Sequence, residues 1–141
     1  MAKIERFEDI IGWQKARELC KTIKSLTKKT EFSKDFKLAG QILDSSGSIM
    51  DNIAEGFERG GNKEFIQFLF ISKGSCGETK SQLYRALDSG YISNDEFKEA
   101  YIQSDEVSRV LEGFIKYLQT TEIKGRKFNN SLKNLIAFLI H

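Results

Sequence analysis

The sequence of 141 residues contains no proline. Because proline disrupts the interior of a helix, its complete absence favours long, uninterrupted helices. The single histidine is His141, the last residue, so no histidine-based triad or metal site is expected within a folded core. A di-iron four-helix bundle would also need Glu-x-x-His pairs, which are missing. We therefore expect no catalytic residues, no metal and no cofactor, and predict that the protein is not an enzyme.

Cysteine is scarce as well, and long apolar runs are absent. The two cysteines, Cys20 and Cys76, fall within helical patterns without metal-ligand spacing, which is typical of small core residues in a reducing compartment. No apolar run approaches the length of a membrane span, and no basic-then-apolar leader opens the chain. The expectation is a soluble, cytoplasmic protein without a membrane partner.

Charge is balanced overall but unevenly distributed. The formal net charge is +2, from 22 basic and 20 acidic residues. Residues 1–30 carry eight basic and four acidic groups, and residues 123–141 carry four basic groups and no acidic one. Basic ends around an acidic middle can indicate a surface that faces a polyanion, although a solvated face is the commoner outcome.

Apolar residues recur at helical spacing in four stretches, and no stretch alternates with the period of a strand. The stretches cover about residues 9–30, 33–58, 63–89 and 93–118. Three short turns between them predict an all-α, antiparallel up-down-up-down four-helix bundle. We expect the bundle to occupy residues 1–122 and a basic, amphipathic C-terminal tail to follow over residues 123–141.

Capping residues mark the expected ends of these helices. Ser33 suits the start of the second helix, and Asn62, after two glycines, suits the start of the third. Gly90 fits the end of the third helix. Ser93 and Glu96 have the spacing of a capping box at the start of the fourth.

The most distinctive segment is residues 48–56, where polar residues lie close to an apolar face. Asn52 and Glu55 stand at helical spacing among Ile49, Ile53 and Gly56. Because buried polar groups without partners are costly, we expect Asn52 and Glu55 to be buried and hydrogen-bonded across to the third helix. Small residues on that helix would allow the close approach; they are Gly74, Ser75 and Gly77.

These motifs resemble the four-helix-bundle family of proteins encoded in intervening sequences of bacterial large-subunit ribosomal RNA genes, which is related to the accessory variability protein of diversity-generating retroelements. The resemblance covers about residues 5–120. The residues that carry it include Trp13, Asn52, Glu55, Gly56, Ser75 and Glu78, with Lys63-Glu64-Phe65 and Gly90-Tyr91-Ile92 in the expected order.

The resemblance implies an up-and-down bundle that assembles as a ring-like homopentamer and has no enzyme activity. It also implies an association with nucleic acid, and the retroelement relatives work beside a reverse transcriptase. The sequence departs from the family pattern in the second helix, where Leu43 and Asp44 stand in place of arginines and Met50 and Asp51 occupy a region that often holds a proline. These changes weaken the case for nucleic-acid binding through the second helix.

Two basic groups are the candidate nucleic-acid contacts. One is a stripe on the first helix with spacings of four, three and four residues, and the other is a cluster at the start of the tail. The residues are Arg17, Lys21, Lys24 and Lys28 in the stripe, and Lys124, Arg126 and Lys127 in the cluster. The alternative interpretation of the stripe is an ordinary solvated helix face.

The third helix is apolar on more than one side, which predicts a second contact besides the core. Phe65 and Leu69 alternate with Phe70 and Ile71 around its circumference. We therefore predict a homo-oligomer. Two functions stay open: a nucleic-acid-associated accessory or scaffold protein that binds RNA or DNA, and a protein-interaction scaffold with no nucleic-acid role.

Overall fold

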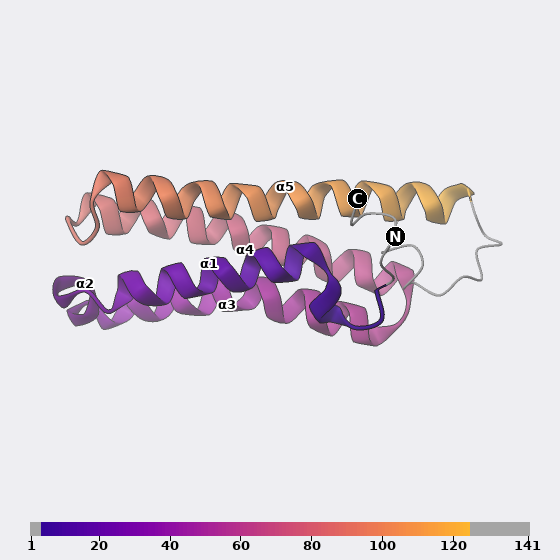
Figure 1. Ribbon diagram of the computed structural model, residues 1–141, viewed down its shortest axis with the longest axis horizontal. Coiled ribbons are helices and arrows are strands. Elements are labelled where there is room, and N and C mark those ends of the chain that lie inside the picture. The colour runs from indigo at the N-terminus through magenta and orange to yellow at the C-terminus, as the bar shows by residue number, and fades with distance from the viewer. Residues whose placement is uncertain (1–3, 125–141) are drawn as a thin grey trace.

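The computed structural model describes residues 4–124, and within them every regular element is a helix. A short 3-10 helix, η1 (Phe7–Asp9), is followed by α1 (Ile11–Thr27) and the five-residue α2 (Thr30–Lys34). Three long helices complete the fold, and they are α3 (Phe36–Arg59), α4 (Asn62–Asp88) and α5 (Asn94–Lys124). The four long helices run along the length of the molecule (Figure 1).

The helices form an antiparallel bundle in which each long helix packs on two neighbours. Cys20 of α1 lies 3.2 Å from the carbonyl oxygen of Ser46 in α3, and Lys15 of α1 forms an ion pair with Glu106 of α5. The start of α4 meets the end of α5, because the Asn62 amide donates to the carbonyl oxygen of Leu118. The predicted all-α four-helix bundle is therefore confirmed.

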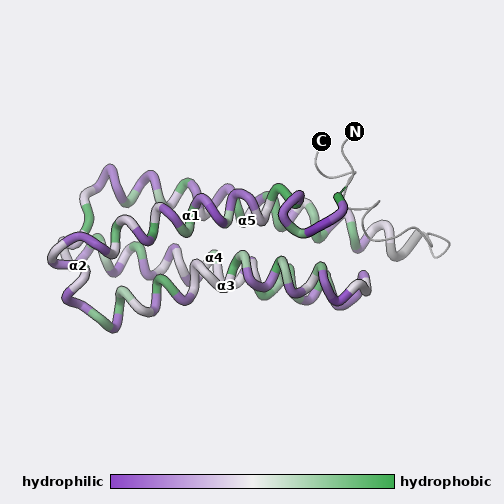
Figure 2. The backbone as a smooth tube through the Cα atoms, turned by 60° about the horizontal axis from the view of Figure 1, so that its bottom comes forward, coloured by the Kyte–Doolittle hydropathy of each residue, from purple (hydrophilic) through white to green (hydrophobic). Residues whose placement is uncertain are grey.

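A continuous apolar core lies along the axis of the bundle. Hydrophobic and hydrophilic residues alternate along each long helix, as the amphipathic pattern requires (Figure 2). The largest fully buried side chains of the core come from all four long helices and from α2. They include Leu19, Phe32, Ile42, Ile49, Ile53, Phe65, Leu69, Leu83, Leu111 and Leu118.

Hydroxyl and amide groups interrupt this core between α3 and α4. The Ser45 hydroxyl lies 2.9 Å from the Thr79 hydroxyl and donates to Gln82 over 2.6 Å. Further along the same interface, Ser72 donates to the carbonyl oxygen of Ile49 over 2.8 Å. Since these buried groups pair with one another, the two helices are held in one register.

The start of the second long helix differs from the prediction. Ser33 lies inside α2, and Asp35 is the N-cap of α3, where its carboxylate accepts from the Leu38 amide over 3.1 Å. The Tyr91 hydroxyl donates to the other carboxylate oxygen of Asp35 over 2.9 Å. These two donors lower the pKa of Asp35, because both favour its charged form.

Two of the three other capping predictions are confirmed. Ser93 and Glu96 form the predicted capping box, with the Glu96 amide donating to Ser93 Oγ and the Ser93 amide donating to Glu96. Gly90 has φ of 77° just after α4, as expected for a helix end. Asn62, however, is the first residue of α4 and not its cap, which is Gly61.

The predicted tail, residues 123–141, lies almost wholly outside the described part of the chain. α5 continues to Lys124, and nothing is described beyond it. The division into a bundle and a tail therefore stays a prediction. No helix among the described residues is long and apolar enough to cross a membrane.

Candidate nucleic-acid interface

The motif around Asn52 is only partly as predicted. Asn52 is half-buried and donates to the carbonyl oxygen and the hydroxyl of Ser48, both in its own helix. Glu55 is exposed and forms an ion pair over 2.9 Å with Arg59, one turn further along α3. The prediction that both side chains are buried and bonded across the helices is therefore wrong. The core face of this helix runs through Ile49 and Ile53, and the polar residues flank it.

Two members of the motif do join α3 to α4. The Ser75 hydroxyl is buried and donates to Ser48 Oγ over 3.1 Å, so Ser48 links Ser75 to Asn52. Gly56 lies so close to α4 that a Cβ there would be 2.6 Å from the Cβ of Phe68. Close packing at residue 56 explains why glycine is needed in the last turn of this helix.

The remaining motif residues do not make the expected contacts. Glu78, Gly74 and Gly77 are all exposed on the outer face of α4, and the space beside both glycines is open. Trp13 is partly buried at the start of α1, where its ring packs edge-on against Phe7 at 5.2 Å. Trp13 therefore anchors the N-terminal segment, and Glu78 takes no part in the core.

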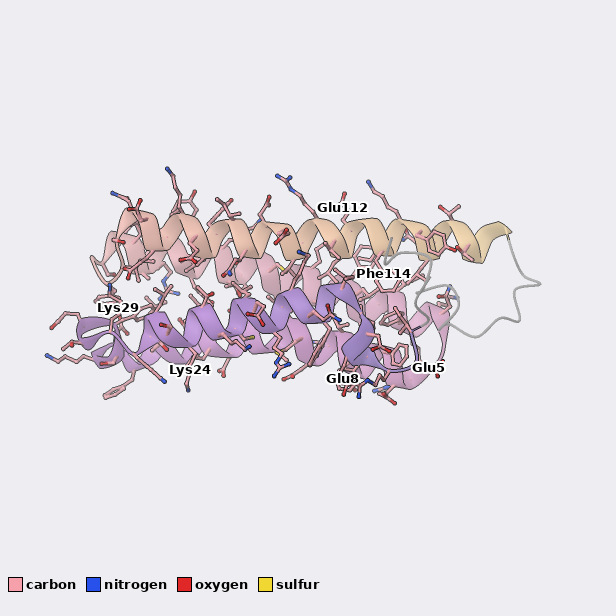
Figure 3. All side chains as sticks on the ribbon, in the orientation of Figure 1. Glu5, Glu8, Lys24, Lys29, Glu112 and Phe114 are labelled. Carbon is pink, nitrogen blue, oxygen red and sulfur yellow. The ribbon has the colours of Figure 1, made fainter. Side chains whose placement is uncertain are left out.

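The basic stripe of α1 is exposed along its whole length and lines a groove between α1 and α3. We call this feature the basic groove. Its α1 wall carries the four stripe residues with Cys20 and Ser25, and its α3 wall is formed by Leu43, Ser46 and Gly47. The groove has a volume of about 530 Å³. In Figure 3 the Lys24 side chain lies at the outer edge of the α1 and α3 pair.

Acidic partners offset little of the charge in the groove. Lys21 pairs with Glu18 over 3.1 Å, and both side chains are more than 60% exposed, so water screens this contact. The Arg17 guanidinium lies 5.8 Å from the centre of the Trp13 ring. Lys24 and Lys28 form no ion pair with any described residue. The groove therefore retains a local positive charge.

Four basic residues on α4 and α5 differ from those of the groove, because each forms an ion pair with a carboxylate. The ion pairs are Lys80–Asp105, Arg109–Asp105, Lys73–Glu112 and Lys116–Glu112, at distances from 2.7 to 3.2 Å. Glu112 is labelled in Figure 3 on the outer side of α5. The neighbouring cations lower the pKa of Asp105 and of Glu112. These four cations therefore lie directly against negative charge, unlike Lys24 and Lys28 in the basic groove.

A thiol lies inside the basic groove. Cys20 is half-buried and its Sγ donates to the carbonyl oxygen of Ser46. Burial raises the pKa of this thiol, and the nearby negative charge of Asp51 raises it further. Cys76 is fully buried at the interior of α4, and burial raises its pKa to about 12. Cys20 is therefore the more accessible of the two thiols, although neither is activated as a nucleophile.

The second basic cluster lies at the end of the described residues and beyond it. Lys124 is the last residue of α5, and its side chain is not among those described. Arg126 and Lys127 lie outside the described residues. No group of three or more metal-ligating side chains occurs in the described part of the chain.

Comparison with known proteins agrees with this architecture. Residues 8–113 match the sequence model of the 23S rRNA-intervening sequence proteins. The chain belongs to this family. The match spans most of the bundle, from η1 to the middle of α5, and confirms the resemblance carried by the sequence motifs. The family description names a gene location and no biochemical activity.

A solved structure resembles this bundle closely. It is the crystal structure of a protein of unknown function from the S23 ribosomal protein family of Bacteroides thetaiotaomicron VPI-5482, with a TM-score of 0.71 and 28% sequence identity. The alignment covers 75% of this chain and 99% of the other. No curated protein matches this chain.

Proposed function

We propose that this protein binds RNA or DNA through the basic groove, largely without sequence preference, as a non-enzymatic accessory or scaffold protein. The observation that carries the proposal is the row of four exposed cations on one wall of a groove, of which only Lys21 has an acidic partner among the described residues. Clustered lysine and arginine side chains release counterions from phosphates, which favours association with any polynucleotide.

The chemistry of the groove supports weak sequence discrimination. Its cations reach phosphates, and phosphate contacts position a nucleic acid without reporting its sequence. No aromatic ring is among the residues that line it. Stacking on aromatic side chains, a common means of reading unpaired bases, is therefore not part of the proposed contact.

A salt titration tests the proposal. We expect the wild-type protein to bind a fluorescently labelled oligonucleotide at about 50 mM salt, with an association constant that falls steeply as salt rises. Four phosphate contacts to a single strand predict a log–log slope of roughly −3. Lys24→Glu together with Lys28→Glu should weaken binding at least about tenfold and flatten the slope by about 1.4.

A matched control separates the groove from net charge. Lys63→Glu with Lys98→Glu makes the same change in charge at two exposed lysines on α4 and α5, away from the groove. This control should weaken binding far less than the groove variant. Equal losses in the two variants, or no binding by the wild type at low salt, would refute the proposed site.

A second candidate function, self-association or another protein contact, is favoured by the outer face of α4. Phe70 and Ile71 are 50% and 51% exposed there, although apolar side chains of this size are usually covered. Gly74 and Gly77 continue the same face, and nothing in the bundle packs against either. We propose that this face contacts a second copy of the chain, in a homo-oligomer whose pentameric form is implied by family resemblance.

The two proposals are compatible with each other. α1 packs on α3 and α5, so the basic groove and the outer face of α4 lie on different helices. A contact through α4 would leave the groove of every copy open. If the groove binds no nucleic acid, the protein-interaction scaffold becomes the better account of the function.

A further inference from the structure

We infer that the basic groove takes a single-stranded polynucleotide in preference to a duplex, with the backbone along α1 and a base or sugar over Gly47. This inference rests on the proposed function and names its ligand more closely. Three features of the groove support it. The cations lie on the α1 wall only, carboxylates flank the α3 wall, and Gly47 leaves open space on the α3 wall.

The positive charge is confined to the α1 wall. Lys28, the C-cap of α1, lies eleven residues after Arg17, a rise of about 16 Å, so the stripe can follow a backbone segment of a few nucleotides. The facing wall contributes Leu43, Ser46 and Gly47, which carry no charge. A single phosphate backbone therefore finds its favourable contacts along one helix.

The far edge of the α3 wall is acidic. Asp44 and Asp51 are exposed, and they lie three residues before and four residues after Gly47, on neighbouring turns of α3. Asp51 is close enough to the groove for its charge to act on Cys20. A phosphate that extends across the groove toward α3 therefore meets like charge.

A duplex cannot avoid these carboxylates as easily as a single strand can. Packed helices lie about 8–10 Å apart, whereas the major groove of B-DNA alone is about 12 Å wide. A duplex laid on the α1 cations would span both helices and bring phosphates of its second strand toward Asp44 and Asp51. The same electrostatic pattern that attracts one backbone opposes two.

Gly47 has no packing role within the bundle. A Cβ at this position would meet no atom within 4 Å, and glycine in a helix interior is about 1 kcal/mol less favourable than alanine. Its missing side chain leaves open space beside Leu43 and Cys20. The apolar surface formed by Gly47, Leu43 and Cys20 can accept the face of a base or sugar. Unpaired nucleotides expose those faces, whereas a duplex stacks its bases inside.

The test measures the affinity of the full chain for oligo(dT), oligo(U) and a mixed-sequence duplex of equal length by fluorescence anisotropy at low salt. We expect both single strands to bind at least about fivefold tighter than the duplex, a difference of about 1 kcal/mol. Gly47→Leu fills the open space beside Leu43 and Cys20 without changing the charge, and should weaken single-strand binding by about fivefold or more. Gly113→Leu, at an exposed glycine of α5 with equally open surroundings, is the matched control and should have no effect.

A second variant tests the acidic edge and does not depend on the folding of the leucine variant. Asp44→Asn with Asp51→Asn should raise duplex affinity about fivefold and change single-strand affinity less than twofold, because only the second strand meets these carboxylates. Duplex binding as tight as single-strand binding in the wild type, or equal gains for both ligands in this variant, would overturn the inference. So would unchanged single-strand binding by a folded Gly47→Leu protein.

These outcomes separate the inference from the proposal on which it rests. If Lys24→Glu with Lys28→Glu binds every ligand as the wild type does, the groove is not the nucleic-acid site and the proposed function fails. If that variant loses affinity while strand state and Gly47 have no influence, the groove binds polyanions by surface charge alone. In that case only the inference fails.

Discussion

At the scale of single residues, Gly56 has the most demanding environment in the bundle. A Cβ at this position would be 2.9 Å from Phe65 Cδ1 as well as 2.6 Å from the Cβ of Phe68. The second of these atoms is fixed to the α4 backbone, so it cannot move without shifting the helix. The α3–α4 contact at this end of the bundle therefore depends on the absence of a side chain.

Gly56→Ala should destabilise the protein by about 1–3 kcal/mol, because overpacking outweighs the gain of about 1 kcal/mol in helix propensity. Gly113→Ala, where the added methyl meets open space, should instead stabilise it by up to about 1 kcal/mol. Urea denaturation followed by circular dichroism measures both. A Gly56→Ala protein as stable as the wild type would mean that the helices separate at little cost.

Sequence reasoning succeeded for some residues of the central motif and failed for others. It placed Ser75 and Gly56 correctly, but on the same argument it placed Gly74 and Gly77 at the contact between the helices, and both are exposed. It misplaced Asn52 and Glu55, which flank the buried positions Ile53 and Gly56 at helical spacing. Positions three or four residues apart share a broad face, so periodicity alone cannot distinguish its centre from its edge.

At the scale of elements, the four long helices could be predicted and the short α2 could not. The helices follow from apolar periodicity, from the missing proline and from caps such as the pair Ser93 and Glu96. The break before α3 depends on tertiary contacts: Phe32 is buried and stacks on Tyr91 at 5.3 Å, and Tyr91 also bonds Asp35. A local sequence pattern cannot predict these contacts, because they join residues almost sixty positions apart.

The groove itself lay beyond sequence reasoning for a similar reason. The spacing of Arg17, Lys21, Lys24 and Lys28 predicted the exposed stripe, and the structure places all four on one wall. The opposite wall depends on which residues of α3 face α1. Gly47 and Leu43 carry no chemical signal of their own, so only the packing of the two helices reveals their part in the groove.

The outer face of α4 gives a prediction at this same scale. Phe70→Ser with Ile71→Ser should convert an oligomer into a particle of 16.1 kDa, because it removes the exposed apolar contact. Phe36→Ser is the matched control, since Phe36 is 84% exposed at the start of α3 and should leave assembly unchanged. Multi-angle light scattering at tens of micromolar measures the mass. A wild-type mass of 16.1 kDa would remove the self-association proposal.

At the scale of the whole molecule, the proposed self-association would strengthen the proposed binding of nucleic acid. A net charge of +2 is too small to hold a polyanion by itself, and the groove concentrates the charge that matters on one wall. Assembly through α4 would present several such grooves to one strand. Linked sites raise overall affinity well above that of a single groove, which suits an accessory or scaffold protein.

The central claim is that nucleic acid lies in the groove between α1 and α3, and alkylation of Cys20 tests it most directly. Because burial raises the pKa of this thiol, its reaction with iodoacetamide should be slow at neutral pH and faster as pH rises toward 9. A rate measured near pH 8.5 should fall at least about fivefold on saturation with a single-stranded oligonucleotide. Cys76, fully buried, should stay unreacted in both states and reports that the protein remains folded. If anisotropy shows the oligonucleotide bound while the Cys20 rate is unchanged, the binding site lies elsewhere and the account of the groove is wrong.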